Sequence, residues 1–195
     1  MFTMFDYEFM RNAFYACTIV GIVAGAVGYF LVLRGQTFAG HALAHVGFPG
    51  ATGAGLIVLI SEDDLREIVS VGRTRMAAAK EPAAGTWFAP FNSTAPTVEW
   101  RAADGKPFAI IQRWHLADHS EPDKEDRPTT KAMLAVTRLP PGAVCHVAYV
   151  DAQANPNPNE LARKAADDLA RNFKCGKDEV KVIGETGRAV SMAKR

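Results

Sequence analysis

Two histidines four residues apart are the first side chains in this sequence whose spacing suggests chemistry. His41 and His45 lie within GQTFAGHALAHVGFPGATGAG, which runs from Gly35 to Gly55. On a helix, positions i and i+4 share one face, where both imidazole nitrogens could ligate Zn²⁺. Two ligands do not complete a metal site, and no Cys, Asp or Glu is close to them in the sequence. Hydrogen bonding between helices is the alternative role for this pair.

A second group of potential metal ligands lies in WHLADHSE, which contains His115, Asp118 and His119. Imidazole and carboxylate groups are suitable ligands for Zn²⁺. Their spacing matches no hydrolase signature, and the acidic, proline-containing segment around them is typical of a solvated loop. The chain also has no G-x-x-x-x-G-K-[ST] phosphate-binding loop for ATP hydrolysis. We therefore expect a protein that is not an enzyme, with a metal site and a solvated loop as the alternatives for this segment.

Cys145 and Cys175 are the candidate disulfide pair. Cys145 lies in the strand-like sequence VCHVAYV (144–150), and Cys175 directly follows an amphipathic helical pattern. If this helix packs on the sheet, the two sulfurs meet, and a bond that closes roughly 30 residues stabilises the fold by about 3–4 kcal/mol. Two separate buried thiols are the alternative. A disulfide would indicate an oxidising compartment such as a periplasm.

The elements that position the two N-terminal histidines are two apolar segments. Residues 12–33 contain no charged side chain, and at about 1.5 Å per residue such a run crosses a hydrocarbon core of roughly 30 Å. A cleaved signal peptide and a buried helix are the alternatives for this run. Gly21 and Gly25 form a G-x-x-x-G pattern, which lets a second helix approach closely. Residues 38–60 are a second candidate span, and Pro49 within it favours packing inside a bundle over contact with lipid.

The two apolar segments and the loop between them resemble the N-terminus of the ABC-type metal-ion permeases that import zinc or manganese. In that family the first span ends in a V-L-R-like sequence, and a G-[DH]-A-L-[SA]-H segment precedes the proline and glycine that open the second span. The likeness covers about residues 5–60 and includes polar and small residues in order as well as apolar ones. The matching positions are Val32, Leu33, Arg34, Phe38, Gly40, His41, Ala42, Leu43, His45, Pro49 and Gly50.

This resemblance implies a protein of the bacterial inner membrane, with zinc or manganese as a transported ion and no bound cofactor. Its partners would be membrane lipids, other permease subunits and a separate ATPase subunit. Members of the family continue through several more spans, whereas this chain becomes charged from Ser61 onward. We therefore expect a truncated or fused permease component that does not transport alone. A membrane-tethered, disulfide-stabilised periplasmic module with a binding or structural role outside transport is the alternative.

The residues beyond the second segment predict a small soluble α+β domain. A charged, amphipathic stretch at 61–80 is typical of a connector helix, and residues 81–85 resemble a linker. After residue 86 we expect an antiparallel sheet covered by one amphipathic helix that begins at Pro158. The expected strands are residues 107–114, 132–139, 144–150 and 180–184.

The sequence thus predicts a transmembrane helical hairpin of one or two spans (1–60), a connector (61–85) and an α+β domain (86–195). The net charge of +1 gives no reason to expect a nucleic-acid partner. Two observations on the side of the membrane conflict. Basic residues after the second segment favour the cytoplasm, whereas the expected disulfide favours the periplasm, where we expect the α+β domain. The basic residues are Arg66, Arg73, Arg75 and Lys80.

Overall fold

The structure, a computed structural model, describes Tyr15, Thr18 and residues 55–193. The chain separates into two units, residues 1–45 and 46–195, which are described individually here. In the first unit, Tyr15 and Thr18 have helical backbone conformation. The predictions for Gly21, Gly25, His41 and His45 fall outside the described residues. Among the described residues, no helix has the length and apolar character needed to span a membrane.

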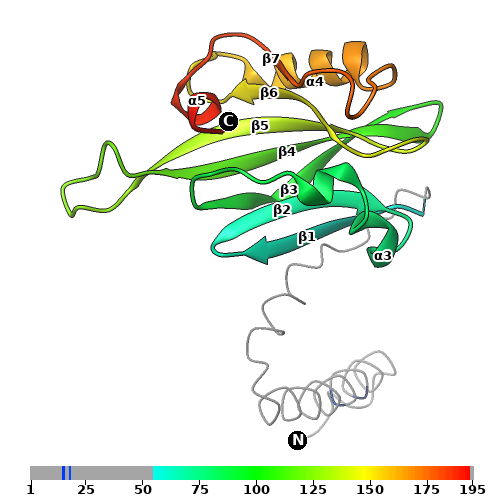
Figure 1. Ribbon diagram of the computed structural model, residues 1–195, viewed down its shortest axis with the longest axis horizontal. Helices are drawn as coiled ribbons and strands as arrows, with labels where there is room; N and C mark the ends of the chain where they lie inside the picture. The colour runs from blue at the N-terminus through cyan, green and yellow to red at the C-terminus, as the bar shows by residue number, and fades with distance from the viewer. Residues whose placement is uncertain (1–14, 16–17, 19–54, 194–195) are drawn as a thin grey trace, which may run out of the picture. The chain divides into compact units, whose positions relative to one another are not determined.

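One seven-stranded sheet organises residues 57–182, and its strands lie side by side in the order in which they occur along the chain. Figure 1 shows this order from β1 at one edge to β7 at the other. Each strand therefore pairs with its neighbour in sequence. The strands are β1 (Ile57–Asp63), β2 (Arg66–Gly72), β3 (Asn92–Ala103), β4 (Lys106–Asp118), β5 (Thr129–Arg138), β6 (His146–Asp151) and β7 (Lys181–Val182).

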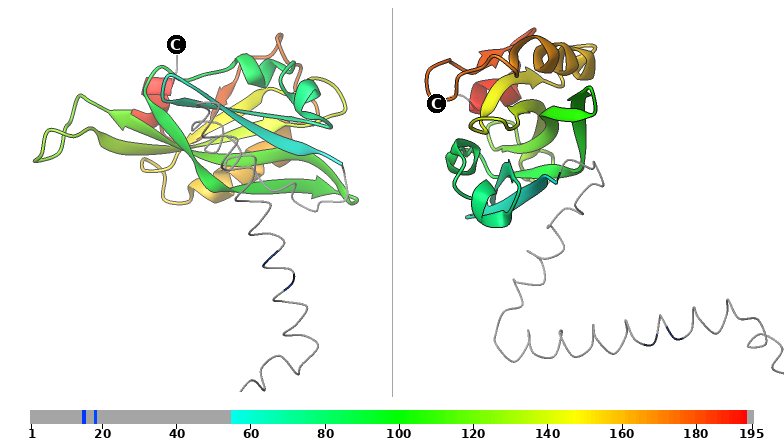
Figure 2. Two further views of the ribbon diagram at one scale, coloured as in Figure 1. Left: turned by 90° about the horizontal axis from the view of Figure 1, so that it is seen from below. Right: turned by 90° about the vertical axis from the view of Figure 1, so that its right-hand side faces the viewer.

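Long antiparallel hairpins form the centre of the sheet. The pairing of β4 with β5 is continuous from Ala109 opposite Arg138 to Asp118 opposite Thr129. Its connecting loop projects beyond the other strands (Figure 2). The strands expected at 107–114, 132–139 and 144–150 correspond to β4, β5 and β6.

The first hairpin corrects two expectations. Residues 57–60, the last part of the second candidate span, are the start of β1, and the connector helix expected at 61–80 is wrong. The β-branched residues of both strands favour extended backbone. Asp64 and Leu65 both have positive φ, 48° and 58°, which is the two-residue turn that suits the twist of a hairpin. The sheet domain therefore begins at residue 57, before the expected boundary at 86.

Side chains make most of the connection between β2 and β3. The two strands are parallel, and their ladder is a single pair, Arg66 opposite Asn92. The amide oxygen of Asn92 accepts a hydrogen bond of 3.1 Å from the backbone N–H of Glu67. The carboxylate of Glu67 accepts two bonds of 2.6 Å from Thr94, one from its backbone N–H and one from its hydroxyl. The buried Glu67 thus replaces part of a missing backbone ladder.

Helix α4 (Pro158–Leu169) covers one face of the sheet, as the sequence predicts. Proline occupies its first turn, but Asn157 makes no side-chain capping bond. Its small buried residues Ala162, Ala165 and Ala166 bring it close to the apolar side chains of β4, β5 and β6. Two ion pairs link the helix to β3 at its edge, Arg163 with Glu99 and Arg101 with Asp167.

Short elements cover the opposite face. They are the 3-10 helix η2 (Pro82–Gly85) and α5 (Arg188–Ala193), whereas α3 (Arg75–Ala78) packs against Ser70 and Gly72 of β2. Ala83 of η2 and Ala189, Val190 and Ala193 of α5 belong to a core that also contains Phe88, Trp114 and Tyr149. The prediction of one helix on an antiparallel sheet is therefore incomplete, because two strand pairs, β2–β3 and β6–β7, are parallel and further short helices occur. The chain between parallel neighbours has to return along the sheet. The segment between β2 and β3 contains α3 and η2, and the segment between β6 and β7 contains α4.

Candidate functional site

The structure joins Cys145 to Cys175. The Cα atoms are 5.9 Å apart and the two sulfurs 2.01 Å apart. Cys145 directly precedes β6, and Cys175 lies in the segment that follows α4. Because α4 packs on β6, its trailing segment passes beside the loop between β5 and β6. The bond thereby fixes the end of the helix to the sheet.

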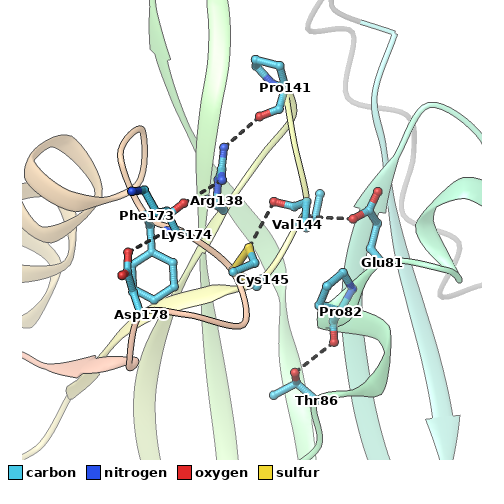
Figure 3. Close-up of a disulfide and its surroundings, with 12 residues drawn as sticks. Glu81, Pro82, Thr86, Arg138, Pro141, Val144, Cys145, Phe173, Lys174 and Asp178 are labelled. Carbon is cyan, nitrogen blue, oxygen red and sulfur yellow. Dashed lines mark hydrogen bonds between the residues drawn. A yellow bond between two sulfur atoms is a disulfide. The ribbon is translucent and has the colours of Figure 1, made fainter.

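Arg138 joins the same two segments through its guanidinium. One terminal nitrogen donates to the carbonyl oxygen of Phe173 at 2.7 Å, and the other to that of Pro141 at 2.8 Å. Figure 3 shows Arg138 between these carbonyls and beside the disulfide. On the other side of the loop, Glu81 accepts a bond of 2.8 Å from the backbone N–H of Val144. Arg138 belongs to no sequence motif, so its role could not be predicted from the sequence.

The structure does not bring His115, Asp118 and His119 together as a metal site. All three were expected on one loop, but β4 extends to Asp118, so His115 and Asp118 point to opposite faces of the sheet. His115 lines a cavity of about 360 Å³ with Phe91. The ring of His119 packs edge-on against Phe91 with its centroid 6.1 Å away. Within residues 55–193 no three His, Cys, Asp or Glu side chains are grouped to hold a metal ion.

Asp118 binds an arginine that is distant in the sequence. Its side chain is 1% exposed and accepts two bonds from Arg188, at 2.8 and 3.0 Å, and one from the Ser120 hydroxyl at 2.7 Å. These bonds, with that from Arg188 first, hold the pKa of the Asp118 carboxyl well below its usual range. The pair anchors α5 to the end of β4. The Asp118 carboxylate therefore has a structural role.

A buried histidine lies among aromatic rings on the same face as α5. The Nδ1 atom of His146 is 2.8 Å from the Tyr149 hydroxyl, and its ring stacks against Phe88 at a centroid distance of 5.8 Å. Trp114 packs edge-on at 6.5 Å. Burial lowers the pKa of His146 to about 4 and raises the pKa of Tyr149. Both groups are neutral near pH 7, so this cluster acts as a core element.

Comparison with known proteins shows what the N-terminal region is similar to. Residues 6–68 match the ABC 3 transport family. This ABC 3 region is also similar to the manganese import system permease protein ScaB of Streptococcus gordonii, with 44% identity over 45 residues. A second relative, the manganese transport system membrane protein MntC of Halalkalibacterium halodurans, is 35% identical over 54 residues. The resemblance to ABC-type metal-ion permeases is therefore confirmed for the N-terminal region.

The similarity covers only a small part of this chain and only a small part of each relative. The stretch similar to ScaB is 23% of this chain and 16% of that protein, and the stretch similar to MntC is 28% of this chain and 18% of that protein. The chain thus spans less than a fifth of the length of these curated relatives. No solved structure matches the chain. The ABC 3 match ends at residue 68, within β2, so the first hairpin of the sheet belongs partly to the matched region.

Proposed function

We propose that this chain is a membrane-bound component derived from the permease of an ABC-type importer of divalent metal ions in a bacterial inner membrane. Manganese is the favoured cargo, because both relatives described above carry manganese in their names. Zinc is the competing cargo that the resemblance implies. Other permease subunits and a separate ATPase subunit would complete the importer.

One observation carries this proposal: the ABC 3 match stops at residue 68, and the chain continues as strands. The permease family continues through several more spans, whereas residues 69–182 contribute to the seven-stranded sheet domain. We infer a truncated or fused permease component that does not transport without other subunits. His41 and His45 belong to the matched region, where structural bonding between helices is favoured over metal contact because they have no third ligand nearby in sequence.

The test is uptake of radioactive manganese in cells that have or lack the gene for this chain. We expect deletion to lower uptake and the plasmid-borne chain to restore it, with unlabelled zinc as a competitor to measure selectivity. Expression of the chain in a strain without any ABC-type manganese importer should give no uptake. Unchanged uptake after deletion refutes the role in import.

The two histidine groups provide a matched pair of variants for the same assay. The substitutions His41→Gln and His45→Gln alter the ABC 3 region, and His115→Gln and His119→Gln remove as many imidazoles from the sheet domain. If the N-terminal pair contacts the metal, only the first double variant lowers uptake while protein abundance stays constant. If both variants transport normally, the histidines have no part in transport.

The second candidate function is a membrane-tethered periplasmic module that binds a ligand or has a structural role and takes no part in transport. The observation that favours it is the bond between Cys145 and Cys175, which suits an oxidising compartment. Protease treatment of spheroplasts, followed by detection of residues 86–195, tests the side of the membrane. Degradation before lysis supports the periplasmic location, and protection until lysis supports the cytoplasm.

A further inference from the structure

A cavity at one end of the sheet gathers positive charge from four separate elements. Its volume is about 680 Å³, and its walls come from the ends of β1 to β5 and from the segment after α4. The four cations that line it are Arg73 after β2, Lys106 at the start of β4, Arg138 at the end of β5, and Arg171 after α4. Asp104 is the one acidic residue in its lining. Four positive charges thus face one negative charge.

These cations have no carboxylate partner within residues 55–193. Every ion pair of the described residues involves other basic side chains, such as Arg101, Arg163 and Arg188. Arg138 is held by the carbonyl oxygens of Phe173 and Pro141, which orient its guanidinium but leave its charge unbalanced. Arg171 lies over the ring of Phe108, with its guanidinium carbon 4.3 Å from the ring centroid. A concave wall of one charge sign attracts and concentrates a ligand of the opposite sign.

The rest of the lining is apolar. Leu56, Phe108, Leu139, Pro140 and Pro141 form these walls. The volume lies within the range of sites that bind small organic ligands, which typically combine apolar walls with a few polar groups that fix orientation. Guanidinium groups match phosphate oxygens through paired hydrogen bonds, and a phosphate carries close to two negative charges, which suits a site with several unbalanced cations.

We propose that this cavity binds a phosphate-bearing amphipathic anion, with the phosphate among the four cations and the apolar part against Phe108 and the two prolines. The proposal is independent of metal import. Two sources could supply this chemistry, the headgroup of an anionic phospholipid and a soluble organic phosphate. A phospholipid is within reach along the chain, because Leu56 borders the cavity and lies within residues 38–60, the second apolar segment, directly before β1 begins at Ile57.

Calorimetric titration of the full-length chain in an uncharged detergent tests the proposal. The probes are a short-chain phosphatidic acid, the matched short-chain phosphatidylcholine, an alkyl phosphate without glycerol, and inorganic phosphate. We expect saturable binding of phosphatidic acid, weaker binding of inorganic phosphate and none of phosphatidylcholine, whose choline cation cancels the phosphate charge and is repelled by the cations of the cavity. Tighter binding of phosphatidic acid than of the alkyl phosphate identifies the lipid source, whereas equal binding of the two identifies the soluble source.

A triple variant and a charge-matched control make the test specific. Arg73→Gln, Lys106→Gln and Arg171→Gln remove three exposed cations of the cavity and leave Arg138 to support the fold. The control removes three exposed cations elsewhere, with Arg75→Gln, Lys124→Gln and Lys164→Gln. We expect the cavity variant to bind phosphatidic acid at least about tenfold more weakly, since it lacks three of the four cations that attract the phosphate. The control should bind like the wild type. Equal affinity of the two variants, or no binding of any phosphate probe to the wild type, overturns the proposal.

Discussion

The buried imidazole of His146 makes stability depend on pH in a defined direction. In the unfolded chain this histidine has a pKa near 6.5, and burial in the folded state lowers it to about 4. Between these values the unfolded chain binds a proton that the folded chain excludes, so the free energy of unfolding falls as the pH falls through this window. The difference is about 3 kcal/mol at roughly 1.4 kcal/mol for each unit of pKa. Above pH 6.5 the effect is absent.

Urea denaturation of the full-length chain in detergent, followed by tryptophan fluorescence, measures this effect. The protein has three tryptophans, and Trp87, Trp100 and Trp114 all lie in the sheet domain. We expect the wild type to lose about 3 kcal/mol between pH 7 and pH 4 beyond the loss in His146→Gln, which keeps a hydrogen-bonding group for Tyr149 but cannot titrate. His119→Gln, at an exposed position, is the control and should follow the wild type. Equal pH dependence in wild type and His146→Gln refutes the reasoning.

Three further predictions concern the sheet domain. Cys145→Ser lowers the free energy of unfolding by about 3–4 kcal/mol, because the Cys145–Cys175 bond closes a loop of roughly 30 residues. Urea titration of the non-reduced protein measures this loss. If the wild type has the same gel mobility with and without reductant, the bond is absent and the prediction is wrong. Gly72→Ala destabilises by about 1–3 kcal/mol, since a Cβ there lies 2.5 Å from the backbone nitrogen of Ala78. An unchanged melting temperature contradicts it, and Gly85→Ala is the control, because a Cβ at Gly85 meets no atom within 4 Å. Arg188→Gln lowers the melting temperature at pH 7 and raises the low pKa of Asp118, so less stability is lost in the variant than in the wild type as the pH falls below about 4. A variant with the melting temperature of the wild type at pH 7 contradicts it.

The central strands could be predicted because their side chains alternate or form short apolar runs between turn residues. Residues 132–139 and 144–150 flank Pro140, Pro141 and Gly142, and this Pro-Pro-Gly sequence strongly indicates a turn. The first hairpin could not be predicted in this way. Ile57–Ile60 continues an apolar segment without a break, and Asp64-Leu65 lacks the glycine that usually indicates such a turn. Strand β3 contains Pro96 and a bulge, which hide its alternation.

The candidate sites also differ in how far they could be predicted from the sequence. The pairing of Cys145 with Cys175 followed from a helix packed on a sheet, which is a local argument about two neighbouring elements. Asp118 was assigned to a loop with metal ligands, although its partner is Arg188, which is 70 residues further along the chain. The cavity cations come from four elements with no shared motif. Contacts of this kind depend on how strands are ordered in space, which residue types and spacing alone do not determine.

The single backbone pair between β2 and β3 has a mechanical meaning for a chain whose N-terminal region is similar to membrane permeases. Any force on the N-terminal segment enters the sheet through β1, whose full ladder with β2 is loaded along the strands and resists strongly. The same force reaches β3 through Asn92, Glu67 and Thr94, a small cluster of side-chain bonds. Glu67 therefore carries much of the polar contact through which such a force passes to the rest of the sheet, beside the apolar packing of Val69 and Val71.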